Sequence, residues 1–258
     1  MRKTVIILSV FALVGSAYSQ ATKKQETTNS KDTLTIFNNT DLVEIQNRSE
    51  SQLFDIQNVD SVKYFTLKEK SNLQKVELKK IVNLEQAKKM LKGQVIWGKY
   101  DEETSEFIED EQGYTIFKIV CRNGKTYYDE VYFIAYYPQE DILLCEGGHT
   151  SDVSFNLTTG EERENVGNLE YITLSPSKQY RLNGYDGGQE CSYYFIQKKI
   201  DGKYQRIIDL YNEFEKKIDF QLCWILDAFW ENDKILNIST TEYPNGKHEK
   251  LYYRIILK

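Results

Sequence analysis

Tight-turn dipeptides recur along this sequence and constrain its fold more than any other feature. Asn-Gly stands at residues 123–124 and 245–246, Asp-Gly at 201–202 and Thr-Gly at 159–160. Asn-Gly and Asp-Gly favour two-residue hairpins, because both central residues of such a turn can need a positive φ. Prolines number only three, whereas tyrosine and phenylalanine, which favour strands, number 19 and 12. From Gly93 onward the sequence therefore predicts antiparallel strands joined by turns.

The residues before Gly93 combine strand-like segments with one helix. Residues 34–47 and 53–70 alternate apolar and polar side chains with Asn and Asp at the breaks, which is typical of half-buried strands. Residues 83–93, NLEQAKKMLKG, predict a short helix. Asn83 is a suitable N-cap, a glutamine follows three residues later as in a capping box, and the last glycine can close the C-terminus. We expect this helix to be the only one.

Aligning the chain on its turns reveals a weak internal repeat. Residues 135–148, 173–185 and 228–240 each have an apolar lead-in, a polar turn and a strand with an apolar pair, and a more degenerate unit precedes them. This pattern predicts four units of two to four antiparallel strands within one β-rich domain over residues 34–258. Their approximate bounds are 93–134, 135–171, 172–225 and 226–258.

Two segments of this repeat resemble motifs of WD-repeat-like β-propellers. SPSKQYRL, residues 175–182, is similar to the SPDGKxL turn and strand, and FNLTTGEE, residues 155–162, is similar to the WDLxTGxx strand and hairpin. The resemblance extends over about half of the chain, although the WD dipeptide is missing and the spacing is irregular. It implies a mainly β fold, a partial or small propeller of antiparallel repeats. Since four blades is the low end for ring closure, a β-sandwich is the alternative.

The N-terminus has the parts of a secretory signal peptide. Arg2 and Lys3 precede an apolar run over residues 4–14, and small residues then predict cleavage before Gln20. This run of eleven residues is too short to span a bilayer core about 30 Å thick, so residues 1–19 are expected to be removed.

The mature chain is therefore expected to be exported, to the periplasm, the cell surface or the medium, with no transmembrane anchor. Residues 20–33 are almost entirely polar and predict a disordered tether. The chain has 33 Lys and Arg against 39 Asp and Glu, a net charge of −6, and no basic cluster. Nucleic acid is excluded as a partner because phosphates need clustered Lys and Arg.

Four cysteines face the oxidising compartment that export implies: Cys121, Cys145, Cys191 and Cys223. No two of them form a C-x-x-C motif, which disfavours a redox or metal site. They predict one or two disulfides, or buried thiols that behave as small apolar side chains. Four cysteines allow three pairings, and the sequence does not choose among them.

No catalytic constellation is assigned. His149 has Ser151 and Asp152 nearby, but the members of a Ser-His-Asp triad are normally brought together from distant parts of a chain. Ser175 and Lys178 match S-x-x-K, yet a proline follows the serine in a turn between strands, and no K-T-G segment occurs.

Metal and cofactor sites are not expected either. Zinc requires several His or Cys ligands at close spacing, and the chain has two histidines in all. The acidic residues 101–113 fail the EF-hand pattern, because Glu106 occupies the place of the required glycine and Gln112 that of the bidentate glutamate. We expect this run to be a solvated loop between two strands.

Tyrosine-rich strands and their loops give the best candidate for ligand binding. Exposed tyrosines offer apolar area and hydroxyls, as sugar- and protein-binding surfaces do, although tyrosine also suits any half-buried strand. Since loops on a rigid scaffold commonly carry function, we expect a ligand site among the loops of the central units. The residues expected there are His149, Asp152, Tyr185, Asp186 and Gln189.

These observations favour an exported, non-catalytic binding or envelope-associated module that recognises a protein or a glycan. Two alternatives from other classes stay open. One is a secreted glycan hydrolase that uses a pair of carboxylates. The other is a structural or inhibitory partner of another exported protein.

Overall fold

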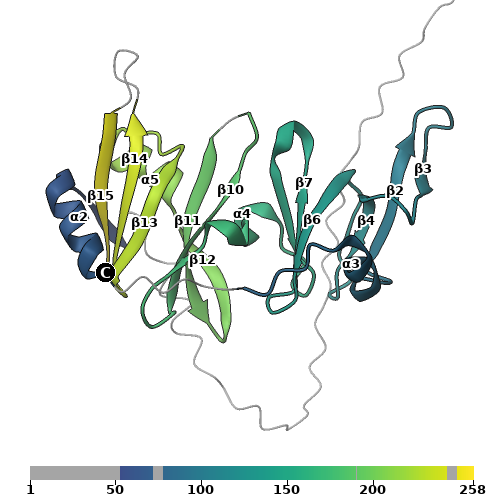
Figure 1. The fold of residues 1–258 in the computed structure, drawn as a ribbon, viewed down its shortest axis with the longest axis horizontal. Helices are drawn as coiled ribbons and strands as arrows, with labels where there is room; N and C mark the ends of the chain where they lie inside the picture. The colour runs from purple at the N-terminus through teal and green to yellow at the C-terminus, as the bar shows by residue number, and fades with distance from the viewer. Residues whose placement is uncertain (1–52, 72–77, 190, 243–248) are drawn as a thin grey trace, which may run out of the picture. The chain divides into compact units, whose positions relative to one another are not determined.

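Antiparallel strands are the main secondary structure of the computed structural model, which describes residues 53–71, 78–189, 191–242 and 249–258 (Figure 1). These residues belong to the second of two units into which the chain divides, residues 40–258. The predicted signal peptide, the tether and the first predicted strand lie outside the described residues. The mainly β, antiparallel fold class predicted from the turns is confirmed.

The first sheet joins the end of the chain to its first described strand. Its strand order is β1-β15-β14-β13, and Phe54 of β1 pairs with Leu257 of β15. The bounds are β1 Phe54–Asn58, β13 Ile225–Asn232, β14 Ile235–Glu242 and β15 Glu249–Leu257. Helix α2, Ser61–Lys70, covers this sheet through Tyr64, which packs on Phe229 and Tyr252. A strand from near the start thus completes a sheet built by the last residues.

The second sheet is a meander of four consecutive strands with the order β12-β11-β10-β9. The bounds are β9 Thr173–Leu174, β10 Tyr180–Asp186, β11 Ser192–Ile200 and β12 Lys203–Asp209. The predicted Asp-Gly turn joins β11 to β12, with φ of 50° at Asp201 and 81° at Gly202. Helix α5, Leu210–Ile218, follows directly and packs on this sheet.

The third sheet has the strand order β3-β2-β4-β6-β7-β8, with β5 paired to β4. The bounds are β2 Val95–Asp101, β3 Glu106–Glu109, β4 Thr115–Val120, β5 Thr126–Tyr127, β6 Val131–Tyr137, β7 Ile142–Glu146 and β8 Asp152–Asn156. Helix α3, Leu84–Met90, buries Ala87 and Leu91 in one cluster with Trp97, Ile116 and Leu143 of this sheet. Three short helical segments follow its last strands: η2 Gly148–Thr150, α4 Arg163–Val166 and η3 Leu169–Tyr171.

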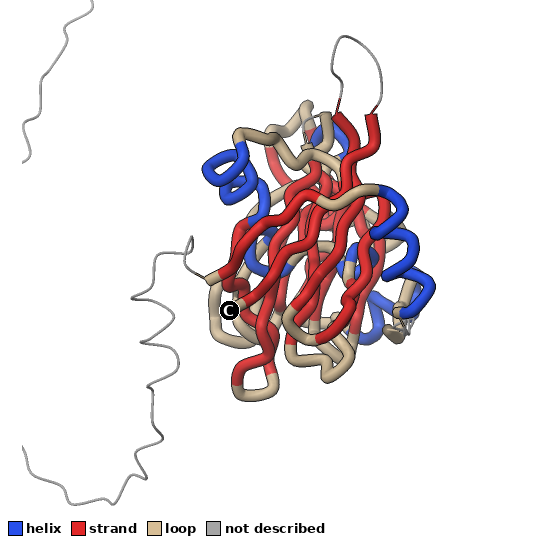
Figure 2. Tube along the Cα trace, turned by 90° about the vertical axis from the view of Figure 1, so that its left-hand side faces the viewer, coloured by secondary structure: helices blue, strands red, loops and turns tan. Residues whose placement is uncertain are grey.

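Two kinds of contact join the second sheet to its neighbours. Towards the first sheet the interface is apolar: Ile196, Leu236 and Ile255 share one fully buried cluster, and the Trp230 indole donates to the Thr173 carbonyl at 3.0 Å. Towards the third sheet, α4 and η3 fill the space, with Val166 and Leu169 buried against β6 and β7. Figure 2 shows these strands in red with the helices at their margins.

The helix content is the main correction to the sequence prediction. Residues 84–90 are helical with Asn83 as N-cap, as predicted, but the expectation of a single helix is wrong. Residues 53–70 were expected to be strand throughout, and only β1 is. Helix α2 follows it because the Asp60 side chain caps the first turn by accepting from the Lys63 backbone N–H at 2.7 Å.

Two further differences have local causes. Helix α5 interrupts the predicted run of strands, because Asp209 caps it and Leu210 and Phe214, four residues apart, bury one helical face. The acidic segment 101–113 was expected to be a loop, but its middle is strand β3, which pairs with β2. Among the described residues, no helix has the length and apolarity needed to cross a membrane.

Phenylalanine replacements test whether β1 is an integral part of the core. Phe54 is 0% exposed in the cluster between the first two sheets, whereas Phe65 on α2 is 50% exposed. We expect Phe54→Ala to lower the free energy of unfolding by about 3–5 kcal/mol, because it removes a buried ring and leaves a cavity. The matched change Phe65→Ala is expected to cost about 1 kcal/mol or less. Urea titrations measure the free energy of unfolding of both variants. Equal losses of stability would contradict the position of β1 in the core.

Candidate functional site

A groove of about 780 Å³ lies between the second and third sheets. One wall consists of the β6–β7 turn and the end of β8, and the other of β11 and β12, with α4 at one side. Most lining side chains are polar or charged, including Glu140, Asp141, Arg181, Gln197 and Tyr204. The groove is therefore built to meet a polar ligand.

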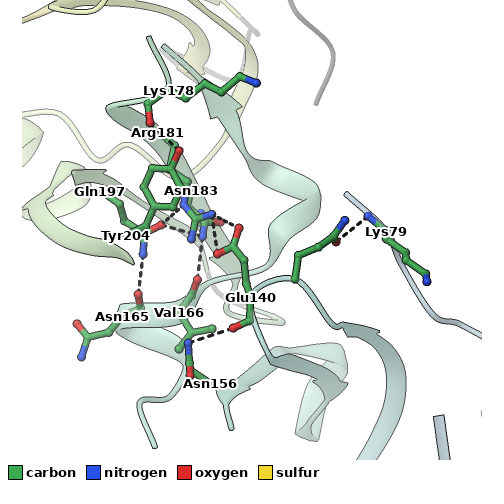
Figure 3. A network of polar contacts seen from close by, with 12 residues as sticks. Lys79, Glu140, Asn156, Asn165, Val166, Lys178, Arg181, Asn183, Gln197 and Tyr204 are labelled. Carbon is green, nitrogen blue, oxygen red and sulfur yellow. Dashed lines mark hydrogen bonds and ion pairs between the residues drawn. The ribbon is translucent and has the colours of Figure 1, made fainter. Parts of the chain in front are cut away.

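Arg181 of β10 is the central side chain of this groove, although it is only 2% exposed. Its Nη1 donates to both carboxylate oxygens of Glu140, at 2.7 and 2.9 Å, and its Nε donates to Oε1 of Gln197 at 2.5 Å (Figure 3). The Tyr204 ring lies 4.0 Å from the guanidinium carbon. An ion pair, a charge-assisted hydrogen bond to an amide oxygen and a cation–π contact thus fix one buried charge.

Two amide side chains extend this network to α4. Asn183 Nδ2 donates to the Val166 carbonyl at 2.8 Å, and Gln197 Nε2 donates to the Asn165 carbonyl at 2.8 Å. These bonds satisfy carbonyls at the end of a four-residue helix that has few partners of its own. Gln197 therefore binds both Arg181 and α4, and so connects this helix to the arginine of the second sheet.

Asp141, the neighbour of Glu140 in the β6–β7 turn, forms a second fixed carboxylate on the same wall. It accepts from Arg122 Nε at 2.8 Å, from the Tyr136 hydroxyl at 2.8 Å and from Thr158 Oγ1 at 2.7 Å. Burial raises the pKa of Asp141, but these hydrogen bonds outweigh it, so the pKa lies below its usual value. Asp141 is consequently an ionised structural group in the wall.

Three of the five residues predicted from the sequence meet at the other end of β10. Asp152 Oδ2 accepts from the Asp186 backbone N–H at 2.8 Å. The His149 carbonyl lies against Gly188 so closely that a Cβ there would meet it at 2.4 Å. Burial raises the pKa of Asp152, which is 8% exposed. His149, Asp152 and Asp186 thus form one loop cluster, and none of the three lines the groove.

The other two predicted residues do not complete a site in the loop cluster. The Tyr185 ring stacks on Tyr193 at 5.2 Å and lies under the Arg163 guanidinium at 5.6 Å. Since side chains alternate along a strand, Tyr185 and its neighbour Asp186 occupy opposite faces of β10. Gln189 is exposed in the β10–β11 loop.

The cysteine prediction is resolved in favour of one disulfide. Cys191 and Cys223 are bonded, with their Cα atoms 4.5 Å apart, while Cys121 and Cys145 are free and buried. The disulfide ties the start of β11 to the segment before β13, and so joins the second sheet to the first. Burial raises the pKa of both free thiols. In the described residues, no group of three His, Cys, Asp or Glu side chains could hold a metal ion.

Sequence reasoning missed the groove because its walls come from distant segments. Glu140 and Arg181 are 41 residues apart and belong to different predicted units. One signal was available: Arg181 stands between Tyr180 and Leu182 in a strand whose neighbours are apolar. A charged residue inside such a strand requires a buried partner.

Comparisons with protein-family models, with curated proteins and with solved structures found no match to this chain.

Asp152, which is buried, and Asp141, which is partly buried, should give opposite pH responses. The raised pKa of Asp152 means that its contribution to stability is present at acid pH and is lost as the pH rises through its folded pKa. The lowered pKa of Asp141 means that its contribution is present near neutrality and is lost as the pH falls.

We therefore expect Asp152→Asn to gain stability relative to the wild type as the pH rises from about 3 to about 7. Asp141→Asn should lose stability relative to the wild type over the same interval. Urea unfolding at several pH values measures both differences. The same slope for the two variants would contradict the environments described here.

Proposed function

We propose that this chain is an exported, non-catalytic binding module and that its ligand, a glycan, occupies the groove between the second and third sheets. The observation that supports the proposal is the groove itself, about 780 Å³ and lined by hydrogen-bonding side chains. A volume of that size accommodates a few sugar units. Saccharide hydroxyls need donors and acceptors together, which amides, carboxylates and guanidinium groups supply.

The pKa of Asp141 and the hydrogen bonds of Glu140 favour binding over hydrolysis. A glycosidase needs one carboxyl with a raised pKa as general acid. Asp141 has a lowered pKa, and both oxygens of Glu140 accept from Arg181. The one aspartate in the described residues whose pKa is raised, Asp152, belongs to the loop cluster and does not line the groove.

A glycan is favoured over a protein ligand by the shape and chemistry of this groove. Protein interfaces commonly have an apolar centre with aromatic anchors. Here the floor is the Arg181 network, and Tyr204 is already stacked on that guanidinium with its hydroxyl donating to the Lys178 carbonyl at 2.8 Å. A polar, preorganised floor suits a hydroxylated chain better than an apolar side chain.

The proposal includes the resemblance to propeller blades. Two features are expected of such blades: the meander of β9 to β12, and the pairing of β1 with β15 in the first sheet. We infer an open, propeller-like arrangement in which the groove lies between neighbouring blades. Export is part of the same proposal, and the Cys191–Cys223 disulfide is compatible with it.

A glycan array probed with the mature chain, followed by calorimetry with the best ligand, tests this function. We expect Gln205→Trp, an exposed position in the groove wall, to weaken binding by about tenfold or more, because the indole occupies ligand space. The matched control Gln57→Trp, exposed on β1 and outside the groove, should bind as the wild type does.

Other outcomes distinguish the alternatives. Loss of binding in His149→Ala but not in Gln205→Trp would move the site to the loop cluster and contradict the proposal. Cleaved products in the calorimeter cell would support the hydrolase, and the absence of any glycan binding would favour a structural or inhibitory role.

A further inference from the structure

We propose that the ligand of the groove is acidic, a saccharide whose sugar units carry carboxylates, held by Lys199, Lys203 and the free edge of Arg181. This inference rests on the proposed function, because it specifies the glycan class that the same groove takes. The observation behind it is that some charged side chains in the groove form ion pairs and others do not.

Most charged side chains that line the groove already have partners. Glu140 accepts from Arg181, and Asp141 accepts from Arg122, so neither carboxylate leaves a free negative charge. The Arg206 guanidinium donates to Asp209 at 2.6 Å. The opposite charges of these ion pairs cancel, so the pairs add hydrogen-bonding groups to the groove but little net charge.

Two lysines that form no ion pair within the described residues give the groove its remaining charge, and the Lys199 ammonium lies 5.7 Å from the centre of the Tyr204 ring. Lys199 and Lys203 line it, and neither forms an ion pair with any residue in the described ranges. Both are exposed on the β11–β12 hairpin, where Lys199 is paired across the strands with Tyr204, the neighbour of Lys203. The only lining carboxylate without an ion pair among the described residues is Glu161, which accepts from Thr159 Oγ1 at 2.9 Å. The unpaired charges therefore sum to a positive value.

Arg181 offers a donor at the floor below these lysines. Its Nε and Nη1 are engaged with Gln197 and Glu140, but within the described residues no hydrogen bond uses Nη2. Because the Arg181 side chain is 2% exposed and lines the groove, we take the groove as the side from which a ligand approaches this nitrogen. A guanidinium nitrogen held in place by its other bonds is a preorganised donor for a carboxylate oxygen.

The charge in the groove is opposite in sign to the net charge of the whole chain. The whole sequence has a net charge of −6, which repels an anionic ligand from the surface at large. Two exposed lysines beside a buried arginine give this groove a local positive charge that attracts such a ligand. A carboxylated sugar satisfies both parts of the site, since its hydroxyls match the amides and its carboxylates match the cations.

The direct test is calorimetry of the mature chain with matched pairs of oligosaccharides. The acidic probes are tetrasaccharides of galacturonate, mannuronate and hyaluronan, and each has a carboxyl-reduced, neutral counterpart of the same length. We expect at least one acidic probe to bind, and its reduced counterpart to bind about tenfold or more weakly. Raising NaCl from about 0.05 to about 0.5 M should weaken the acidic probe selectively.

Two charge variants connect the effect to the groove. Lys199→Gln with Lys203→Gln should weaken binding of the acidic probe by about tenfold and weaken binding of its neutral counterpart much less. Lys89→Gln with Lys92→Gln makes the same change in net charge on exposed residues outside the groove, and should leave both unchanged.

The failures of the two proposals are separable. If neutral glycans bind the groove as well as or better than the acidic probes, the acidic ligand is wrong and the glycan-binding function stands. If no probe and no glycan on the array binds, both are wrong. If the two charge variants weaken binding equally, the groove lysines are not the determinant.

Discussion

A buried guanidinium determines how the second and third sheets meet. Removing Arg181 from water costs several kcal/mol, and only close partners offset that cost. Those partners are Glu140, from a turn of the third sheet, and Gln197 from the adjacent strand. Because Glu140 contacts Arg181, the β6–β7 turn is held against β10. This contact sets the distance between the two walls of the groove. The groove is thus a consequence of satisfying one charge.

The two interfaces of the second sheet show why the hollow lies on one side only. Towards the first sheet, side chains such as Ile196, Leu236 and Ile255 are 0% exposed and pack without polar partners, so that interface is closed. Towards the third sheet, Val166 and Leu169 make apolar contacts, but charged and amide side chains stand beside them and line the groove. A short helix, α4, fills part of the space and is held by Asn183 and Gln197. The interface between the first and second sheets is packed with apolar side chains, whereas polar side chains line a groove between the second and third sheets.

The sequence predicted features that depend on neighbouring residues and missed those that depend on distant ones. Turn chemistry at Asp201-Gly202 and the Asn83 cap are local, and both are confirmed. Helix α2 was missed because its residues alternate like a strand until the Asp60 cap is recognised. Asp152 and Asp186 were expected in one loop site and do meet, but the Glu140–Arg181 pair spans 41 residues and leaves no periodic signal. That Arg181 lies inside a strand was the available clue, and its partner could be found only in three dimensions.

A double-mutant cycle on the ion pair tests the central claim most directly. Glu140→Leu alone should lower the free energy of unfolding by about 3 kcal/mol, because it leaves a charge buried without its counter-ion. Arg181→Met alone should cost less, since Glu140 is 24% exposed and can be solvated. The double variant is predicted to be more stable than the sum of the single losses implies, by about 2 kcal/mol. Losses that add to within about 0.5 kcal/mol would contradict the account, because the two side chains would then not be coupled across the groove.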